Sequence, residues 1–349
     1  MTNPKRVGIL TSGGDCPGLN AAIRAVVNHA TLTYGWELLG IPYATRGLLE
    51  CKTIPLGVHS LDLRGIDPLL NMGGTILGTI NHGNTLARAD EILDGYRAIA
   101  LDALIAIGGD GSLAILHELA KRGNWQLVAI PKTIDNDVAL TERAIGFDTA
   151  INTVTDALNR LTFTAASHDR VMVVEVMGRK AGHLALHSGI AGGADVILIP
   201  EIPYSIQGVR QHIAELRDRW GRKFAIVVVA EGANHARESL QSSACGMGQY
   251  VADLIAECSP VDLEIRASVL GHIQRGGIPS AIDRLTAAAF AKAAVDLLAQ
   301  GESGKMVAWR SGRVEAVRIR DVVECSPLSV DPNGTLVQTA RALAIYVGD

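Results

Sequence analysis

This chain has few aromatic residues, no pattern of paired cysteines and no large excess of one charge. Only 4% of the 349 residues are aromatic, so the core must be mostly aliphatic. The net charge is −4, and without a strong basic field nucleic acid is not an expected partner. The five cysteines are far apart and show no CxxC or Cys/His spacing, which indicates reduced thiols rather than a disulfide framework or a zinc site.

Long apolar runs are also missing. No stretch of about 18 apolar residues occurs, and residues 1–6 lead into a strand-like run without an apolar signal segment. We therefore expect a cytoplasmic protein with no membrane partner. Hydrophobic residues at 48% and charged residues at 19% are typical of a globular enzyme, and the length allows about two domains.

Glycine, by contrast, is abundant: 37 glycines cluster in short motifs that follow strand-like aliphatic runs. Such runs alternate with amphipathic stretches in both halves of the chain. Repeated β-then-α units predict an α/β fold with two Rossmann-like lobes, mostly parallel sheets flanked by helices, and an active site in the cleft between the lobes. The motif clusters predict one lobe from residues 1–146 plus about 274–311, and the other from 147–273 plus about 312–349.

Two neighbouring motifs indicate a phosphate-handling site. The apolar run 104–107 ends in Gly108-Gly109-Asp110-Gly111-Ser112, and the run 127–130 is followed by Lys132-Thr133-Ile134-Asp135-Asn136-Asp137. Carboxyl ends of parallel strands meet at one sheet edge, where ligands bind in open α/β folds. Glycines let backbone N–H groups approach phosphate, and an aspartate can hold Mg²⁺. We expect Asp110 to contact Mg²⁺, although a turn with Asp110 as helix cap is the alternative.

A third glycine-rich loop follows the first strand-like run. Residues 13–18 have the spacing of a P-loop, but Leu19-Asn20 replaces the Lys-Ser/Thr pair, which disfavours a standard P-loop NTPase. A glycine-rich turn before a helix suits an anion, and an ordinary tight turn would explain it equally well.

Five motifs occur together and in one order along most of the chain. They span Val7 to about Ala299 and resemble the 6-phosphofructokinase A family: Thr11-Ser12-Gly13-Gly14-Asp15-Cys16-Pro17-Gly18-Leu19-Asn20, Gly108-Gly109-Asp110-Gly111-Ser112, Pro131-Lys132-Thr133-Ile134-Asp135-Asn136-Asp137, Val174-Glu175-Val176-Met177-Gly178-Arg179 and Gly271-His272-Ile273-Gln274-Arg275-Gly276-Gly277.

The resemblance implies a phosphotransferase with an alcohol acceptor. ATP-using members convert fructose 6-phosphate to fructose 1,6-bisphosphate and ADP in glycolysis, with Mg²⁺. Asp135 resembles the general base, Thr133 would lie near the transferred phosphoryl group, and Arg179 resembles the arginine that stabilises transition-state charge. The 1–146 lobe would bind the donor and the other lobe the sugar phosphate.

The resemblance also implies contact residues. Those for the donor are Gly13, Gly109, Asp110, Gly111, Ser112 and Lys132. Those for the sugar phosphate are Thr133, Asp135, Arg170, Met177, Gly178, Arg179, Glu231, Arg266, His272 and Arg275. Counterparts of Arg170 and Arg266 reach in from a neighbouring subunit, which implies a homo-oligomer, a dimer or a tetramer. Taken alone, His272 is more often structural and Glu231 could be a cap.

Two positions give opposite indications of the donor. ATP-using members have glycine at the position of Gly111, where pyrophosphate users carry an aspartate, whereas Lys132 matches the pyrophosphate users. We weight Gly111 more heavily and expect ATP, because a carboxylate there would repel the α-phosphate. Alternatives are a pyrophosphate-dependent enzyme, a kinase of a related sugar phosphate such as sedoheptulose 7-phosphate, and a sugar-phosphate sensor without turnover.

Two further features depart from the family or stay open. The usual donor-loop arginine is replaced near Asn81, and Lys132 is a candidate substitute. Of the family's effector-binding arginines Arg24 remains, and a cationic cluster comprises Arg217, Arg219, Arg222 and Lys223. This cluster fits a solvated helix end, and effector binding is the other interpretation.

Overall fold

Short aliphatic runs form the strands of two sheets in the computed structural model, which describes residues 4–60, 62, 64, 66–80, 84–233, 246–257 and 263–348. The chain divides into two units. Unit 1 consists of Met1–Thr149 and Arg275–Pro327, and unit 2 of Ala150–Gln274 and Leu328–Asp349. Each has a sheet flanked by helices, and the predicted α/β class with mostly parallel sheets is confirmed.

Unit 1 has a seven-stranded sheet in the order β11-β10-β5-β4-β1-β2-β3. Its inner pairs are parallel, and only the edge strands β3 and β11 run antiparallel to their neighbours. Strand β4 is buried along its whole length, as expected for an aliphatic strand covered on both faces. The strands are β1 (Arg6–Ser12), β2 (Glu37–Gly40), β3 (Ile54–Leu56), β4 (Ala103–Gly108), β5 (Leu127–Pro131), β10 (Lys305–Arg310) and β11 (Arg313–Arg318).

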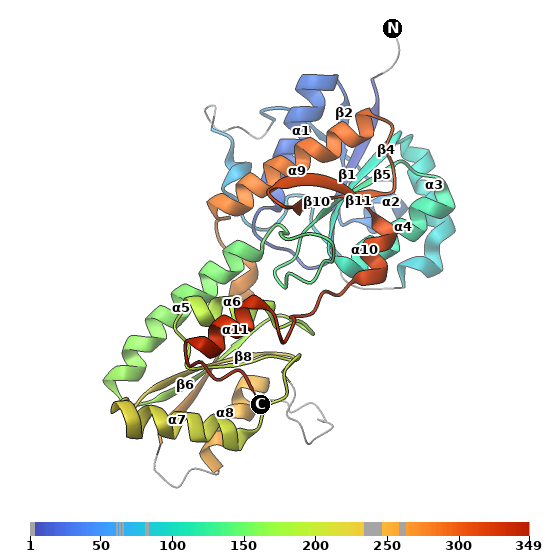
Figure 1. The fold of residues 1–349 in the computed structure, drawn as a ribbon. Coiled ribbons are helices and arrows are strands. Elements are labelled where there is room, and N and C mark those ends of the chain that lie inside the picture. Colours follow the sequence, from blue (N-terminus) through green and yellow to red (C-terminus); the bar gives the residue numbers. More distant parts are fainter. Residues whose placement is uncertain are drawn as a thin grey trace. The chain divides into compact units, whose positions relative to one another are not determined.

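Helices cover both faces of this sheet (Figure 1). Helices α1 (Leu19–Tyr34) and α9 (Ala281–Ala299) pack against each other on one face. The other face is covered by α2 (Thr45–Leu49), α3 (Ala89–Ile99), α4 (Asp110–Gly123) and α10 (Ile319–Cys325). Leu113, Leu116 and Leu119 are the predicted apolar stripe of α4, and all three are buried. Two 3₁₀ turns, η1 (Pro68–Leu70) and η2 (Thr85–Arg88), complete the unit.

Unit 2 has a four-stranded, fully parallel sheet in the order β7-β8-β6-β9. Its strands are β6 (Val171–Val176), β7 (Val196–Leu198), β8 (Ala225–Ala230) and β9 (Ile265–Val269). Helices α7 (Ile206–Trp220) and α8 (Met247–Glu257) lie on one face, and α5 (Phe147–Ser167), α6 (His183–Ala191) and α11 (Thr335–Ala342) on the other (Figure 1). The turn η3 (Gly271–Arg275) ends where the chain returns to unit 1.

The C-terminal part of the chain is shared between the units. Strand β11 pairs with β10, so residues up to Pro327 belong to unit 1, whereas the expected division assigns residues 312–349 to the other lobe. The reason is a hairpin: β10 pairs with β5, and β11 folds back along it. Beyond Leu328 the chain belongs to unit 2, where Tyr346 bridges to Val196 beside β7.

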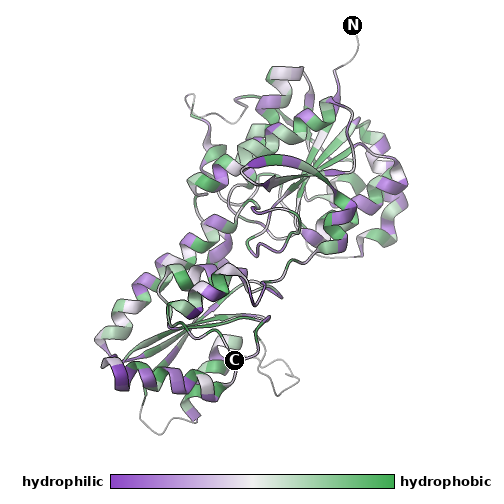
Figure 2. Cartoon of the chain, viewed as in Figure 1, coloured by the Kyte–Doolittle hydropathy of each residue, from purple (hydrophilic) through white to green (hydrophobic). Residues whose placement is uncertain are grey.

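Hydropathy follows this layering. Figure 2 shows apolar residues concentrated in the strands of both sheets, with polar residues on the outward sides of the surrounding helices. The buried set is dominated by Val, Ile, Leu and Ala, which confirms the aliphatic core predicted from the low aromatic content. Within the described ranges, no helix combines the length and apolar character needed to cross a membrane.

Candidate active site

The glycine-rich motifs of unit 1 follow three adjacent parallel strands. In the pairing register, Ser12 of β1 lies opposite Gly108 of β4, and Gly108 lies opposite Pro131 of β5. The residues that follow these three strands therefore emerge at one edge of the sheet, as the sequence predicts. This edge brings together the loop after β1, the start of α4 and the loop after β5.

The Gly-Gly-Asp-Gly-Ser segment forms the N-terminus of a helix. Gly109 is the capping residue in an extended conformation, Asp110 is the first residue of α4, and no side chain caps this helix. The alternative of Asp110 as cap is therefore wrong. The first N–H groups of a helix have no intrahelical partner and carry positive partial charge, so this end favours an anion. A Cβ atom built on Gly111 would meet nothing within 4 Å, so the space beside it is open.

The loop after β5 is polar and buried. Lys132, Thr133, Asp135 and Asp137 are each less than a tenth exposed. The Thr133 hydroxyl donates to Asp137 Oδ1 at 2.8 Å and accepts from the Asp135 backbone N–H at 2.9 Å. Asn136 has a φ of 52°, which turns the chain between the two aspartates. Asp137 and Thr133 thus fix the backbone that carries Asp135.

Two cations meet the loop after β1. Lys132 Nζ donates to the carbonyl of Gly14, and Arg275 Nη1 donates to the carbonyl of Asp15 at 3.1 Å. A Cβ on Gly14 would lie 2.6 Å from Arg275 Nη1, so a larger residue there would require the end of the Arg275 side chain to shift. Within unit 1, Arg275 therefore lies beside the loop that contains the expected donor contact Gly13, although the resemblance implies that Arg275 contacts the sugar phosphate.

The sugar-side motifs of unit 2 follow the parallel strands β6 and β8. Met177, Gly178 and Arg179 come directly after β6, and Glu231 follows β8, the neighbouring strand. Glu231 Oε1 accepts from the backbone N–H of Arg179 at 2.7 Å and of Gly178 at 3.3 Å. This carboxylate therefore shapes the backbone of the Met-Gly-Arg turn, in which Arg179 has a φ of 51°.

A fully buried glutamine also supports this turn. Gln274 Oε1 accepts from the Met177 backbone N–H at 3.2 Å, and its Nε2 donates to the Gly271 carbonyl at 2.9 Å. Sequence reasoning missed Gln274, although a glutamine inside the Gly-His-Ile-Gln-Arg motif was the available signal. His272, in the same 3₁₀ turn, is exposed.

Arg170 and Arg266 lie at the opposite edge of the unit 2 sheet. Arg170 precedes β6, and Arg266 is the second residue of β9. Both guanidinium groups pair with Glu264 Oε1 at 2.7 Å. The hydrogen bond from Arg170 and the charges of both arginines lower the pKa of the Glu264 carboxyl. Within one chain, these arginines are therefore not brought to the strand ends that carry Arg179 and Glu231.

Three of the five cysteines lie within the described part of the chain. Cys16, Cys51 and Cys325 are free thiols, and burial raises the pKa of Cys16 to about 12, so it stays protonated. Cys245, Cys258 and the expected substitution near Asn81 lie outside the described residues. Over the described part of the chain, no group of three or more His, Cys, Asp or Glu side chains could hold a metal by itself.

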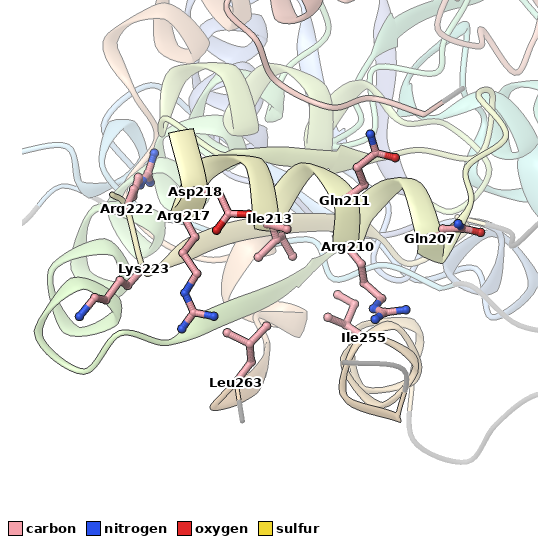
Figure 3. Close-up of a pocket in the computed structure, with 11 residues that line it drawn as sticks. Gln207, Arg210, Gln211, Ile213, Arg217, Asp218, Arg222, Lys223, Ile255 and Leu263 are labelled. Atoms are coloured by element: carbon pink, nitrogen blue, oxygen red, sulfur yellow. The ribbon is translucent and has the colours of Figure 1, made fainter. Parts of the chain in front are cut away.

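The cationic cluster before β8 divides between two sides of α7. Arg217, Arg222 and Lys223 line a cavity of about 420 Å³ together with Arg210, over a floor that includes Ile213, Ile255 and Leu263 (Figure 3). Arg222 is held in a bidentate ion pair with Asp195, at 2.6 and 3.0 Å. Arg219 lines a separate cavity with residues of the C-terminal segment. On helix α1, Arg24 is paired with Asp67.

A family model described as phosphofructokinase matches residues 6–298, which is more than half of the chain. The chain belongs to the phosphofructokinase family. It is 73% identical, over 99% of both chains, to a Nostoc sp. protein named ATP-dependent 6-phosphofructokinase 2. The predicted family is thereby confirmed.

Solved phosphofructokinase structures share the fold. The crystal structure of Pichia pastoris phosphofructokinase in the T-state aligns with a TM-score of 0.82 and 30% identity, covering 99% of this chain and 37% of that one. A pyrophosphate-dependent phosphofructokinase from Nitrosospira multiformis aligns with a TM-score of 0.84 and 22% identity, covering 99% of this chain and 93% of the other. The same fold therefore occurs in a pyrophosphate-dependent enzyme, and fold alone does not select the donor.

Proposed function

We propose that this phosphofructokinase transfers the γ-phosphoryl group of ATP to the 1-hydroxyl of fructose 6-phosphate, giving fructose 1,6-bisphosphate and ADP. The observation that carries the proposal is the placement of buried Asp135 after β5, one strand over from the uncapped helix N-terminus after β4. In the proposed function, this carboxylate is the base and the neighbouring helix end binds the anionic donor. The name of the 73% identical relative supports the donor and the reaction, and the proposal includes a cytoplasmic role in glycolysis.

In this mechanism the protein positions reactants and stabilises charge. Asp135 takes the proton of the attacking hydroxyl, and the Thr133 hydroxyl lies near the transferred phosphoryl group. Arg179 stabilises the negative charge that develops on the transferred group, a role that suits a fixed fork of N–H donors. Glu231 holds the backbone of Gly178 and Arg179, and so acts by setting the direction of the arginine.

The remaining contacts divide between the two substrates. Gly13, Gly109, Gly111 and Ser112 line the donor side, where main-chain N–H groups at the start of α4 meet phosphate oxygens. Met177, His272 and Arg275 serve the sugar phosphate, with Arg275 held at the Asp15 carbonyl. Gln274 belongs to neither set, because it acts on the backbone of Met177 and Gly271.

Magnesium fits the donor edge through Asp110. Mg²⁺ is usually bound by one or two carboxylates together with phosphate oxygens and water, so no all-protein cage is required. Asp110 stands in the first turn of α4, and its carboxylate has no hydrogen-bond or ion-pair partner among the described residues. When bound, the ion would neutralise charge on the donor phosphates. Asp110 would hold it there.

A homo-oligomer, a dimer or a tetramer, would complete the sugar-phosphate site. Arg170 and Arg266 lie at the strand edge remote from Arg179, yet they match family residues that bind the sugar phosphate. A neighbouring subunit that supplies these two arginines reconciles both observations. Glu264 would hold the two guanidinium groups together until the phosphate arrives.

Lys132 is expected to contribute a positive charge to donor binding. It is buried, and its Nζ donates to the Gly14 carbonyl on the loop that contains the expected donor contact Gly13. The K132M variant keeps the length of the side chain and removes the charge. We expect KM for ATP to rise about tenfold with kcat changed less than about threefold, as for a residue that acts in ground-state binding.

The control for this prediction is K132R, which keeps the charge. A coupled assay with varied ATP at saturating fructose 6-phosphate measures both variants. Unchanged KM and kcat in K132M would show that Lys132 does not take the place of the arginine missing near Asn81.

The proposed activity is tested by ADP release with Mg²⁺-ATP and fructose 6-phosphate, run in parallel with pyrophosphate as donor and sedoheptulose 7-phosphate as acceptor. Formation of fructose 1,6-bisphosphate with ATP as the better donor supports the proposal. Faster turnover with pyrophosphate would show that the donor is pyrophosphate, as Lys132 indicates, and not ATP, as Gly111 indicates. Tight sugar-phosphate binding without any turnover would identify a sensor.

A further inference from the structure

A buried carboxylate that the proposed mechanism does not use lies at the start of α9. Asp283 is 1% exposed, and its two oxygens accept three hydrogen bonds. Oδ1 accepts from the Gly146 backbone N–H at 2.9 Å, and Oδ2 accepts from the backbone N–H and the hydroxyl of Thr149 at 2.9 and 2.5 Å. Burying a carboxylate is costly, and burial indeed raises the pKa of Asp283. So many donors on one acceptor make a strong local anchor.

The anchor joins two distant segments. The Thr149 hydroxyl also accepts from the Ser280 backbone N–H at 2.9 Å, and the Ser280 side chain accepts from the Asp283 backbone N–H at 3.1 Å. The start of α5 is thereby tied to the start of α9. The chain passes between the units after Thr149, after Gln274 and after Pro327. The first of these connections begins at Thr149, which is part of the anchor, and the second begins six residues before Ser280.

The anchor leads directly to the catalytic loop. Ile145, next to Gly146, accepts from the Thr133 backbone N–H at 3.0 Å and donates to the Pro131 carbonyl at 3.2 Å. Gly146 has a φ of 105°, and a Cβ there would lie 2.5 Å from Cys16 Cβ, so the segment passes close to the loop after β1. A displacement of Gly146 would therefore be passed on to Thr133.

The same anchor restrains the position of the segment that carries Arg275. Only residues 276–279 separate Arg275 from Ser280, whose backbone is bonded to Thr149. Arg275 in turn donates to the Asp15 carbonyl, on the loop that also receives Lys132. Asp283 is therefore connected to two residues near the proposed site. The connection to Thr133 runs through Gly146, and the connection to Arg275 runs through Ser280.

We infer that Asp283 is a positioning residue for phosphoryl transfer, which holds Gly146, Thr149 and Ser280 so that the Thr133–Asp135 loop and Arg275 keep their places. The inference rests on the proposed function. Asp283 acts by keeping other groups in place, since a misplacement of about 1 Å in reacting groups can lower the rate about 10²-fold. This positioning role differs from a purely stabilising one, because the loss of the Asp283 anchor should slow turnover in molecules that remain folded.

The test uses the full chain with paired variants at Thr149 and Asp283. T149V removes the hydroxyl that bonds to Asp283 and Ser280 while keeping the shape of the side chain, and T149S keeps the hydroxyl. D283N replaces one acceptor oxygen with an amide NH₂ that faces an N–H donor. We expect kcat to fall about tenfold or more in D283N and about fivefold in T149V, with KM values within about threefold, and T149S to stay within about twofold of wild type.

The control is D296N on the same helix. Asp296 pairs with Lys292, His29 and Tyr34 at the surface of unit 1, so its loss should lower Tm while kcat stays within about twofold. Activities are measured well below each Tm. Hydrogen exchange of peptides covering residues 131–149 should be faster in T149V than in T149S, which reports the loosened backbone directly.

Different results would contradict the positioning role of Asp283 and the proposed phosphofructokinase activity. A lowered Tm with kcat unchanged in D283N and T149V would overturn the positioning role and leave a stabilising one. If D283N does not fold, the difference between T149V and T149S decides, and equal kcat values in those two variants would overturn the inference. A wild-type protein without turnover would count against the proposed function itself, before any variant is compared.

Discussion

Replacing Asp135 with asparagine is expected to lower kcat about a thousandfold, within the 10²- to 10⁴-fold range of general acid–base catalysis, while KM for ATP changes less than about threefold. The amide has nearly the shape of the carboxylate but does not take up the proton of the attacking hydroxyl. The variant keeps the hydrogen bond that the backbone N–H of residue 135 donates to the Thr133 hydroxyl. A coupled assay with fructose 6-phosphate and ATP gives both constants.

The matched control is D137N, two residues away in the same loop. Asp137 is as buried as Asp135 but accepts the hydrogen bond of the Thr133 hydroxyl, so it acts on position rather than on the proton. We expect a loss of about tenfold in kcat for D137N, much less than for D135N. A larger loss in D137N than in D135N would exchange the two roles, and a D135N variant with nearly normal kcat would remove Asp135 as the base.

The strands and helices could be predicted from the sequence because they depend on the pattern of neighbouring residues. An aliphatic run such as residues 104–107 is buried on both sides, so it predicts a parallel strand, and β4 is buried along its whole length. Once strands are placed, parallel pairing determines which residues share an edge. The grouping of Asp110 with Asp135 therefore followed from the pattern of the sequence alone.

The remaining features depend on partners that periodicity does not reveal. The assignment of residues 305–318 to unit 1 depends on the pairing of β10 with β5, about 180 residues earlier in the chain. Gln274 and Asp283 look ordinary in the sequence, because each owes its place to backbone N–H groups of a distant segment. The remote edge occupied by Arg170 and Arg266 also became visible only with the bounds of β6 and β9.

Gly111 is expected to decide whether ATP is used. In the G111D variant, kcat/KM for ATP should fall about 10²-fold or more, because like charges placed together cost several kcal/mol and each 1.4 kcal/mol is a factor of about ten. The new carboxylate would stand in the first turn of α4, at the end proposed to bind the nucleotide phosphates. Pyrophosphate lacks the α-phosphate that this carboxylate would repel and the sugar that it would crowd.

The structure allows this effect to be separated from folding. A Cβ at Gly111 meets nothing within 4 Å, and an acidic residue in the first turn of a helix is stabilising by about 0.3–1 kcal/mol, so Tm should not fall in G111D. The control is G111A, which adds a methyl group without charge and should keep kcat/KM for ATP within about threefold. Loss of ATP turnover in both variants would point to steric contact rather than charge. An ATP rate in G111D equal to that of wild type would show that the residue after Asp110 does not face the nucleotide, and the donor would then have to be determined by Lys132 and its neighbours.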